Sequence, residues 1–168
     1  EEPPASPAAL IQAFVDAGRE AGYPVTPDYN GYQQEGFGPM EMTVHHGFRW
    51  SAANAYLRPA MRRPNVKLVT RAYVHRVVLE GKRATGVEYE VGGEVVTAKA
   101  RREIVIAASS INSPKILQLS GIGPPEVLKA AGLPVNHVLP GVGENLHDHL
   151  EIYFQMESKR PVTLYSSL

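Results

Sequence analysis

The chain has 168 residues, of which 43% are hydrophobic and 20% charged, and this composition argues against intrinsic disorder. Lysine and arginine number 17, as do aspartate and glutamate, so no net field favours binding to nucleic acid or to an anionic membrane. Cysteine is absent, which excludes disulfides, thiolate metal ligands and a cysteine nucleophile.

The two ends of the chain predict a segment of a longer protein. The sequence begins Glu1-Glu2-Pro3-Pro4, without an initiator Met or a basic presequence, and no stop signal marks Leu168. No apolar run approaches the roughly 18 residues that span a bilayer. We therefore expect no transmembrane segment in this chain, and we give the missing targeting signals no weight.

The first third of the chain predicts two helices separated by a long loop. Ser6-Pro7 is a good helix start, the apolar residues of 10–15 recur at helical spacing, and Gly22 ends the helix. Residues 26–46 are rich in Gly, Pro, Asn and aromatics and show no periodicity, which is typical of either a functional loop or disorder, and the aromatic residues favour an ordered loop. Residues 51–61 suit a short helix.

The middle of the chain predicts a β-meander. Residues 66–70 alternate, residues 73–79 are rich in β-branched side chains, and a turn follows. Residues 85–91 and 94–98 form a second pair of strands, which Gly92-Gly93 joins as a two-residue hairpin.

Residues 103–108 are continuously apolar after Glu103, as for a strand buried on both faces of a parallel sheet. The strand runs into Ala107, Ala108 and Ser109, whose small side chains would let a flat or phosphate-bearing cofactor approach its carboxyl end. An alternative is that the small residues only allow the strand and the next helix to pack closely.

The rest of the chain predicts short elements. Residues 114–119 and 125–131 read as helices, the second ended by Gly132, while residues 135–139 and 151–156 read as strands.

The stretch SSINSPKILQLSGIG, residues 109–123, resembles the second signature of the GMC flavoprotein oxidoreductases, the family of glucose, methanol and choline oxidoreductases. Residues 49–53, 55–60, 81–89 and 140–149 also look like this family. Two positions depart from its usual pattern: Ser109 stands where Gly is usual, and His147 stands where Gln is commoner. The signature is met by Ser109, Ser110, Ser113, Pro114, Ile116, Leu117, Ser120, Gly121, Ile122 and Gly123.

The resemblance implies a mixed α/β (α+β) fold. Residues 1–60 would precede the meander, residues 61–149 would form part of a Rossmann-type FAD-binding domain, and residues 150–168 would start a substrate domain on an antiparallel sheet. The cofactor would be FAD, whose flavin takes a hydride from an alcohol carbon.

The same resemblance implies where this segment borders the cofactor. In the family, the strand that matches residues 71–77 contacts adenine through backbone groups, which points to Val74. Ala107, Ala108 and Ser109 would lie near the ADP half. The G-x-G-x-x-G phosphate turn and the catalytic His of the family have no counterpart in this chain, so no catalytic residue is assigned.

Residues 33–38 and 149–153 look most like the members of the family that oxidise choline. By that likeness, His149, Glu151 and Tyr153 would shape the substrate pocket. A trimethylammonium group has no proton to donate, so only charge and aromatic faces can hold it. On a strand, Glu151 and Tyr153 share a face. The alternative is a solvated Glu on an edge strand.

Two other kinds of site are unconvincing. His147-Asp148-His149 resembles a metal site, but adjacent ligands seldom converge without others, and His45-His46 is more typical of a loop surface. Ser120, Asp148 and His149 would make a triad on paper, yet no G-x-S-x-G elbow exists to position a nucleophile.

Three functional hypotheses follow. The first is a segment of an FAD enzyme that oxidises choline to betaine aldehyde, for glycine betaine synthesis, with an electron acceptor other than nicotinamide. The second is another GMC alcohol oxidase or dehydrogenase, and the third is a non-catalytic binding module. By resemblance to the animal members we expect a mitochondrial location, associated with the inner membrane; the alternative is the cytoplasm or membrane of a bacterium.

Overall fold

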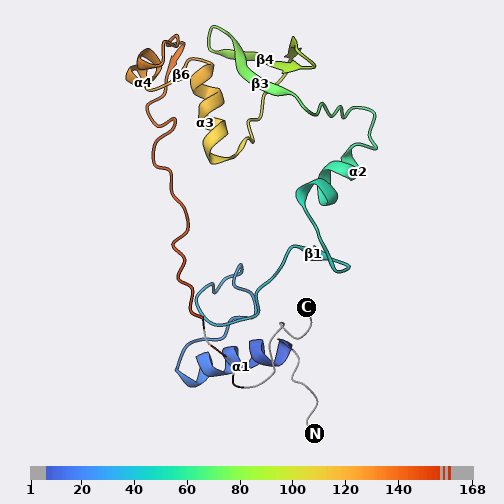
Figure 1. Cartoon of the computed structure of the whole chain (residues 1–168), viewed down its shortest axis with the longest axis vertical. Helices are drawn as coiled ribbons and strands as arrows, with labels where there is room; N and C mark the ends of the chain where they lie inside the picture. The colour runs from blue at the N-terminus through green and yellow to red at the C-terminus, as the bar shows by residue number, and fades with distance from the viewer. Residues whose placement is uncertain (1–6, 156, 158, 160–168) are drawn as a thin grey trace. The chain divides into compact units, whose positions relative to one another are not determined.

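The structure is a computed structural model that describes residues 7–155, 157 and 159 (Figure 1). It divides into two units, one made of Glu1–Arg63 and Glu151–Leu168 and the other of Pro64–Leu150. The second unit carries the meander and the signature stretch.

In the first unit, helix α1 (Pro7–Glu20) begins where the sequence predicts, although the proposed cap Ser6 lies outside the described residues. Gly22, at φ 86°, ends the helix, as predicted. The long loop after it is anchored by Phe37, whose ring lies 5.1 Å from the ring of Phe14 and 5.4 Å from that of Tyr23. The aromatic residues therefore hold the loop against α1.

A small hairpin and a helical turn complete the described first unit. Strands β1 (Val44–His45) and β2 (Phe48–Arg49) pair antiparallel across a turn. The predicted helix at 51–61 is confirmed as a π-helical turn, η1 (Ala53–Leu57), that continues into α2 (Arg58–Ala60).

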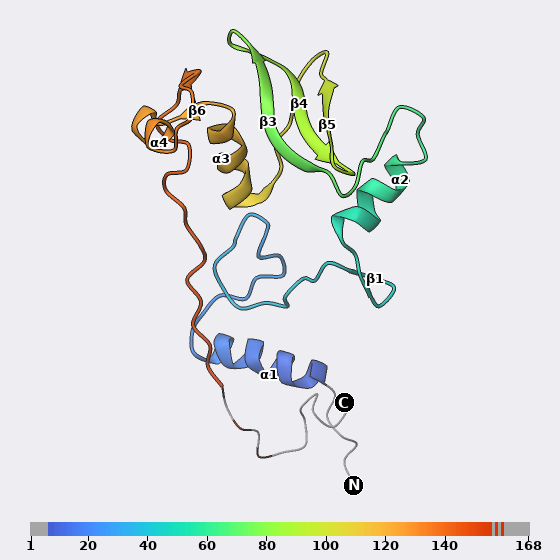
Figure 2. The same cartoon turned by 45° about the horizontal axis from the view of Figure 1, so that its top comes forward.

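The second unit is built on the predicted meander (Figure 2). Strands β3 (Tyr73–Glu80), β4 (Arg83–Val91) and β5 (Glu94–Lys99) form an antiparallel sheet in the order β3-β4-β5. Gly92 and Gly93 have φ of 63° and 85°, the left-handed conformation that a tight two-residue hairpin requires. The hairpin prediction is confirmed.

The signature stretch forms the other half of the second unit. Helix α3 (Ser109–Leu119) starts five residues before the predicted helix at 114, and it is followed by β6 (Ile122–Gly123), α4 (Pro125–Ala130) and β7 (His137–Val138). Strands β6 and β7 pair in parallel. In both views α3 lies beside β3, the edge strand of the meander (Figures 1 and 2).

Three predicted strands are wrong. Residues 66–70, 103–108 and 151–155 form no strand, and Met156 lies outside the described residues. Val105, expected to be buried on both faces of a parallel sheet, is 80% exposed. The reason is that a strand needs a partner for its backbone groups, and none of these segments pairs with another segment within the described residues.

The predicted fold class is confirmed, because the unit combines helices with an antiparallel sheet. Its buried apolar side chains are Val77, Leu128 and Val142. No helix among the described residues is long and apolar enough to cross a membrane.

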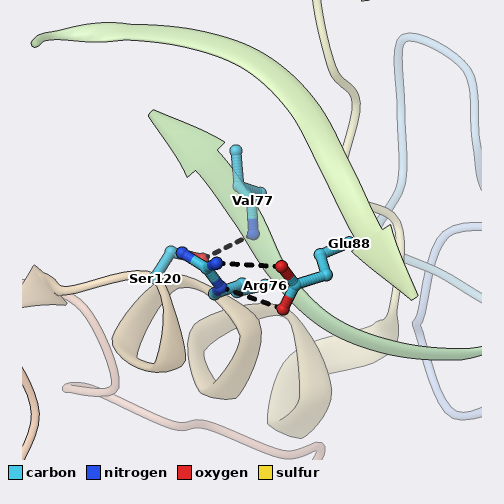
Figure 3. Close-up of polar contacts among 4 residues, drawn as sticks. All are labelled: Arg76, Val77, Glu88 and Ser120. Atoms are coloured by element: carbon cyan, nitrogen blue, oxygen red, sulfur yellow. Dashed lines mark hydrogen bonds and ion pairs between the residues drawn. The ribbon is translucent and has the colours of Figure 1, made fainter. Parts of the chain in front are cut away.

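A cross-strand ion pair ties β3 to β4 on the sheet surface (Figure 3). Arg76 and Glu88 are opposite each other in the register, and the guanidinium donates two hydrogen bonds to the carboxylate, at 3.0 and 2.8 Å. The hydrogen bond from Arg76 holds the pKa of Glu88 below its ordinary value. Both groups are partly exposed, so the pair fixes geometry more than it stabilises the fold.

Candidate functional site

The candidate site begins with the contact between α3 and the free edge of β3. Strand β3 pairs only with β4 among the described strands, so backbone groups on its other edge need different partners. The Ser120 hydroxyl accepts a hydrogen bond from the Val77 N–H at 2.8 Å (Figure 3). It also donates one to the Ile116 carbonyl at 2.6 Å. Ser120 is only 3% exposed, so water does not replace these bonds.

The glycine after Ser120 lets the chain turn tightly behind α3. Gly121 has φ 75°, and a Cβ there would lie 2.5 Å from the Asn136 amide nitrogen and 2.7 Å from the Pro134 carbonyl oxygen. The Asn136 amide also donates to the Ser120 carbonyl at 3.0 Å. A side chain at Gly121 would therefore push the 134–136 segment away from α3.

The other end of α3 is held by a second signature serine. The Ala108 N–H donates a hydrogen bond to the Ser113 hydroxyl at 3.0 Å, which fixes the chain as it enters the helix. Between them, Ser109 has φ 69°, in the left-handed region that favours glycine. This conformation gives a physical reason for the glycine that the family usually has at this position. Serine adopts the same conformation only at a cost in backbone strain.

A pocket of about 200 Å³ lies between the start of β3 and the face of α3. It brings together two of the four residues predicted to border the cofactor, Val74 and Ala108, from positions far apart in the sequence. Ala107 and Ser109 are exposed and do not line it. The lining consists of Ala72, Tyr73, Val74, Ala108, Asn112, Lys115, Ile116 and Leu119.

Sequence reasoning missed the polar residues of this pocket. Tyr73, Asn112 and Lys115 stand among its apolar lining, and the Lys115 ammonium donates a hydrogen bond to the Tyr73 hydroxyl at 3.3 Å. A usable signal was present, because Ala108, Asn112 and Lys115 recur at spacings of four and three, which place them on one face of a helix.

A larger recess of about 610 Å³ lies near the C-terminal end of α3. Its lining comes from β3, from the end of α3 and from the 134–136 segment, and it contains none of the residues predicted to bind cofactor or substrate. We therefore place the candidate site in the smaller pocket.

The three residues predicted to bind substrate lie on exposed, extended chain. The His149 N–H donates a hydrogen bond to the Asp148 carboxylate at 2.8 Å. The Tyr153 hydroxyl donates to the Glu151 carboxylate, so these two side chains meet on one face of the chain even though no strand forms. That hydrogen bond raises the pKa of Tyr153 above its ordinary value, because losing the proton would set two negative charges side by side.

No group of three or more metal-ligating side chains converges within the part of the chain that the structure describes. The His45 and His46 rings lie 4.1 Å apart and His45 packs on Trp50 at 4.7 Å, so these histidines belong to an aromatic cluster on the β1–β2 hairpin.

The model of the GMC oxidoreductase family matches residues 2–151. The chain belongs to the GMC oxidoreductase family. Among curated relatives, the chain is similar to an oxygen-dependent choline dehydrogenase from Brucella anthropi, with 64% identity over 159 residues, and to one from Rhizobium meliloti, with 58% identity. Each match covers 95% of this chain and 29% of the relative. The chain thus spans less than a third of the length of these relatives.

Two solved structures share the fold of this chain. A pyridoxine 4-oxidase from Mesorbium loti matches with a TM-score of 0.71 and 34% identity, covering 78% of this chain and 26% of that one. An FAD-dependent oxidoreductase from Chaetomium thermophilum matches with a TM-score of 0.73 and 34% identity, covering 84% of this chain and 25% of that one. The named curated relatives are bacterial, so they do not support the mitochondrial location expected from the sequence.

The buried hydroxyl of Ser120 predicts a stability effect. Replacing Ser120→Ala leaves the Val77 N–H without a partner, and the free energy of unfolding is expected to fall by about 1–3 kcal/mol. Urea unfolding measures this change. Ser110→Ala, at an exposed position of the same helix, is the matched control and should change the free energy by less than about 0.5 kcal/mol. Equal effects of the two substitutions would contradict the role of Ser120.

The left-handed backbone at Ser109 predicts that a substitution by glycine there stabilises the fold. Ser109→Gly relieves the strain and should raise the free energy of unfolding by up to about 1 kcal/mol, since the relief exceeds the entropy that glycine adds to the unfolded chain. Ser110→Gly, in ordinary helical backbone, should lower it by about 0.5–1 kcal/mol. The two midpoints of urea unfolding would then move in opposite directions; movement in the same direction would refute the strain at Ser109.

Proposed function

We propose that this chain is a segment of an FAD-dependent enzyme that oxidises choline to betaine aldehyde. The observation that carries the proposal is the 64% identity, over 95% of the chain, to the oxygen-dependent choline dehydrogenase of Brucella anthropi. A bacterial origin fits the named relatives, and the reaction would supply betaine aldehyde for glycine betaine synthesis.

Exposed apolar surface supports the view that further protein packs on this segment. In the second unit, Val105 is 80% exposed and Ile111 is 68% exposed. Such exposed apolar side chains would be removed from water if further protein packed on them. We therefore propose that further protein covers the apolar 103–108 segment.

The α3–β3 pocket fits part of FAD. Its apolar wall, which includes Val74 and Ala108, suits a flat ring, and Asn112 and Lys115 offer hydrogen-bond donors at its edge. At about 200 Å³ it is smaller than the roughly 300–1,000 Å³ that encloses a drug-sized ligand, so it would take the adenine portion only. When bound, FAD supplies the acceptor for the hydride of the alcohol.

Ala107 and Ser109 would contribute backbone near the same half of the cofactor. Ser113 positions this stretch through its hydrogen bond with the Ala108 N–H. The task of this segment would be to bind and orient the cofactor, while the residues that move protons and hydride lie elsewhere in the longer protein.

Glu151 and Tyr153 fit the recognition of a quaternary ammonium. Tyr153 donates one hydrogen bond to the Glu151 carboxylate, which orients the carboxylate and places an aromatic ring next to it. A negative charge beside an aromatic ring is the environment that trimethylammonium groups prefer. His149, two residues earlier, would complete the residues that shape the substrate site.

A second candidate is oxidation of a different alcohol by the same fold. The observation that favours it is the 34% identity to a pyridoxine 4-oxidase, which shows that similar sequences occur in a GMC enzyme named for another substrate. The choline proposal and this alternative differ in what Glu151 does.

The charge of Glu151 separates the two candidates. In the longer protein, Glu151→Gln should raise the KM for choline by about tenfold or more, since a carboxylate about 4 Å from a cation contributes up to roughly 4 kcal/mol before desolvation. Oxidation of 3,3-dimethylbutan-1-ol, the neutral analogue of choline, should hardly change. Dye reduction measures both rates.

The matched control is Glu157→Gln, at an exposed position of the same segment, which should leave both substrates unaffected. A protein that is active on neutral alcohols and inactive with choline would support the second candidate. Equal effects of Glu151→Gln on choline and on its neutral analogue would contradict the proposed role of Glu151.

A further inference from the structure

We propose that Gln118 is a positioning residue for substrate recognition, because it fixes the path on which the chain leaves the second unit toward His149 and Glu151. This inference rests on the proposed choline function, in which those two residues shape the substrate site. Gln118 lies on α3 within the signature stretch, at a position that the family signature leaves free.

The side chain of Gln118 fills a slot between two glycines. A Cβ added at Gly123 would lie only 3.3 Å from the Cγ atom of Gln118. A Cβ added at Gly143 would lie 2.8 Å from its Nε2 atom. A side chain at either glycine would therefore shift Gln118 from its half-buried place.

The amide of Gln118 holds the backbone of a buried residue. Its Nε2 atom donates a hydrogen bond to the Val142 carbonyl at 3.3 Å. Val142 is 7% exposed, whereas Gly141 and Gly143 on either side of it are exposed. Because this hydrogen bond is partly buried, water replaces it poorly, and its loss would cost free energy.

The loop of residues 139–143 is fastened to the unit at both ends. At its start, the Leu139 N–H donates to the Gly123 carbonyl at 3.1 Å. Toward its end, the Val142 N–H donates to the Leu139 carbonyl at 3.2 Å, and the Val142 carbonyl accepts the bond from Gln118. Gln118 therefore sets the direction in which the chain continues beyond the loop.

The bond from Gln118 is the last long-range hydrogen bond before the residues predicted to bind substrate. From Gly143 to His149, the hydrogen bonds within the described part of the chain join only near neighbours in the sequence. A change of direction at Val142 would therefore displace His149 by more than it displaces Val142 itself.

The effect of Gln118 should fall on recognition and not on the chemical step. No catalytic residue is assigned in this chain, so displacing the segment that carries His149 and Glu151 should weaken binding of the trimethylammonium group and leave hydride transfer largely unchanged. A neutral alcohol makes no charge interaction with Glu151, so its binding should hardly respond.

Steady-state oxidation of choline and of 3,3-dimethylbutan-1-ol by the longer protein tests this inference. Gln118→Met keeps the length of the side chain and removes the donor. It should raise the KM for choline about threefold to tenfold, and change kcat and the KM for the neutral alcohol by less than about twofold. Gln118→Glu, whose ionised carboxylate cannot donate to Val142, should raise the KM for choline at least as much.

A double-substitution cycle with Glu151→Gln tests whether Gln118 acts through Glu151. Once the charge of Glu151 is removed, adding Gln118→Met should raise the KM for choline by less than about twofold. Effects that multiply in the double variant would mean that the two residues act independently, and would overturn the inference.

The matched control is Gln12→Met, at an exposed glutamine of α1, which should leave both KM values unchanged. An unchanged KM for choline in the Gln118→Met protein would overturn the inference, as would equal rises for the two alcohols. Loss of activity on both alcohols in both Gln118 variants would show a role in folding alone and would also overturn it. An unmodified protein that does not oxidise choline would overturn the proposed function itself.

Discussion

A hydrogen bond between a buried side chain and a strand edge organises the second unit. The Ser120 hydroxyl accepts a hydrogen bond from the Val77 N–H on the open edge of β3, and it donates a hydrogen bond to a backbone carbonyl of α3. An unpaired N–H at this buried position would cost free energy, so the bond fixes both the distance and the register between helix and strand. The pocket exists because α3 is held along β3 in this way.

The family signature in this chain acts mainly through architecture. Ser113 fixes the entry of α3, Ser120 fixes its far end, and Gly121 allows the 134–136 segment to pass directly behind it. None of these three residues lines the pocket. These serine and glycine residues, which look like ligand-binding groups in the sequence, thus hold α3 in the position where Val74 and Ala108 line the same pocket.

Local patterns predicted local structure well. Helix α1, the meander and the Gly92-Gly93 turn depend on neighbours in the sequence, so spacing and composition sufficed. The strand predicted at 103–108 is wrong, because an apolar composition indicates only that a segment can be buried. It does not indicate whether another strand lies beside the segment to pair with its backbone. Likewise, Lys115 joins Val74 only through the packing of α3 on β3, which no local pattern encodes. The family resemblance pointed to Val74 and Ala108, and the structure adds the polar side chains of Tyr73, Asn112 and Lys115 beside them.

The central claim is that the α3–β3 pocket receives the adenosine half of FAD. A crystal structure of the longer protein with bound FAD tests it most directly. The account predicts the adenine ring in van der Waals contact, within about 4 Å, of Val74 and Ala108. A structure in which protein side chains fill this pocket and the adenine lies elsewhere would contradict the account.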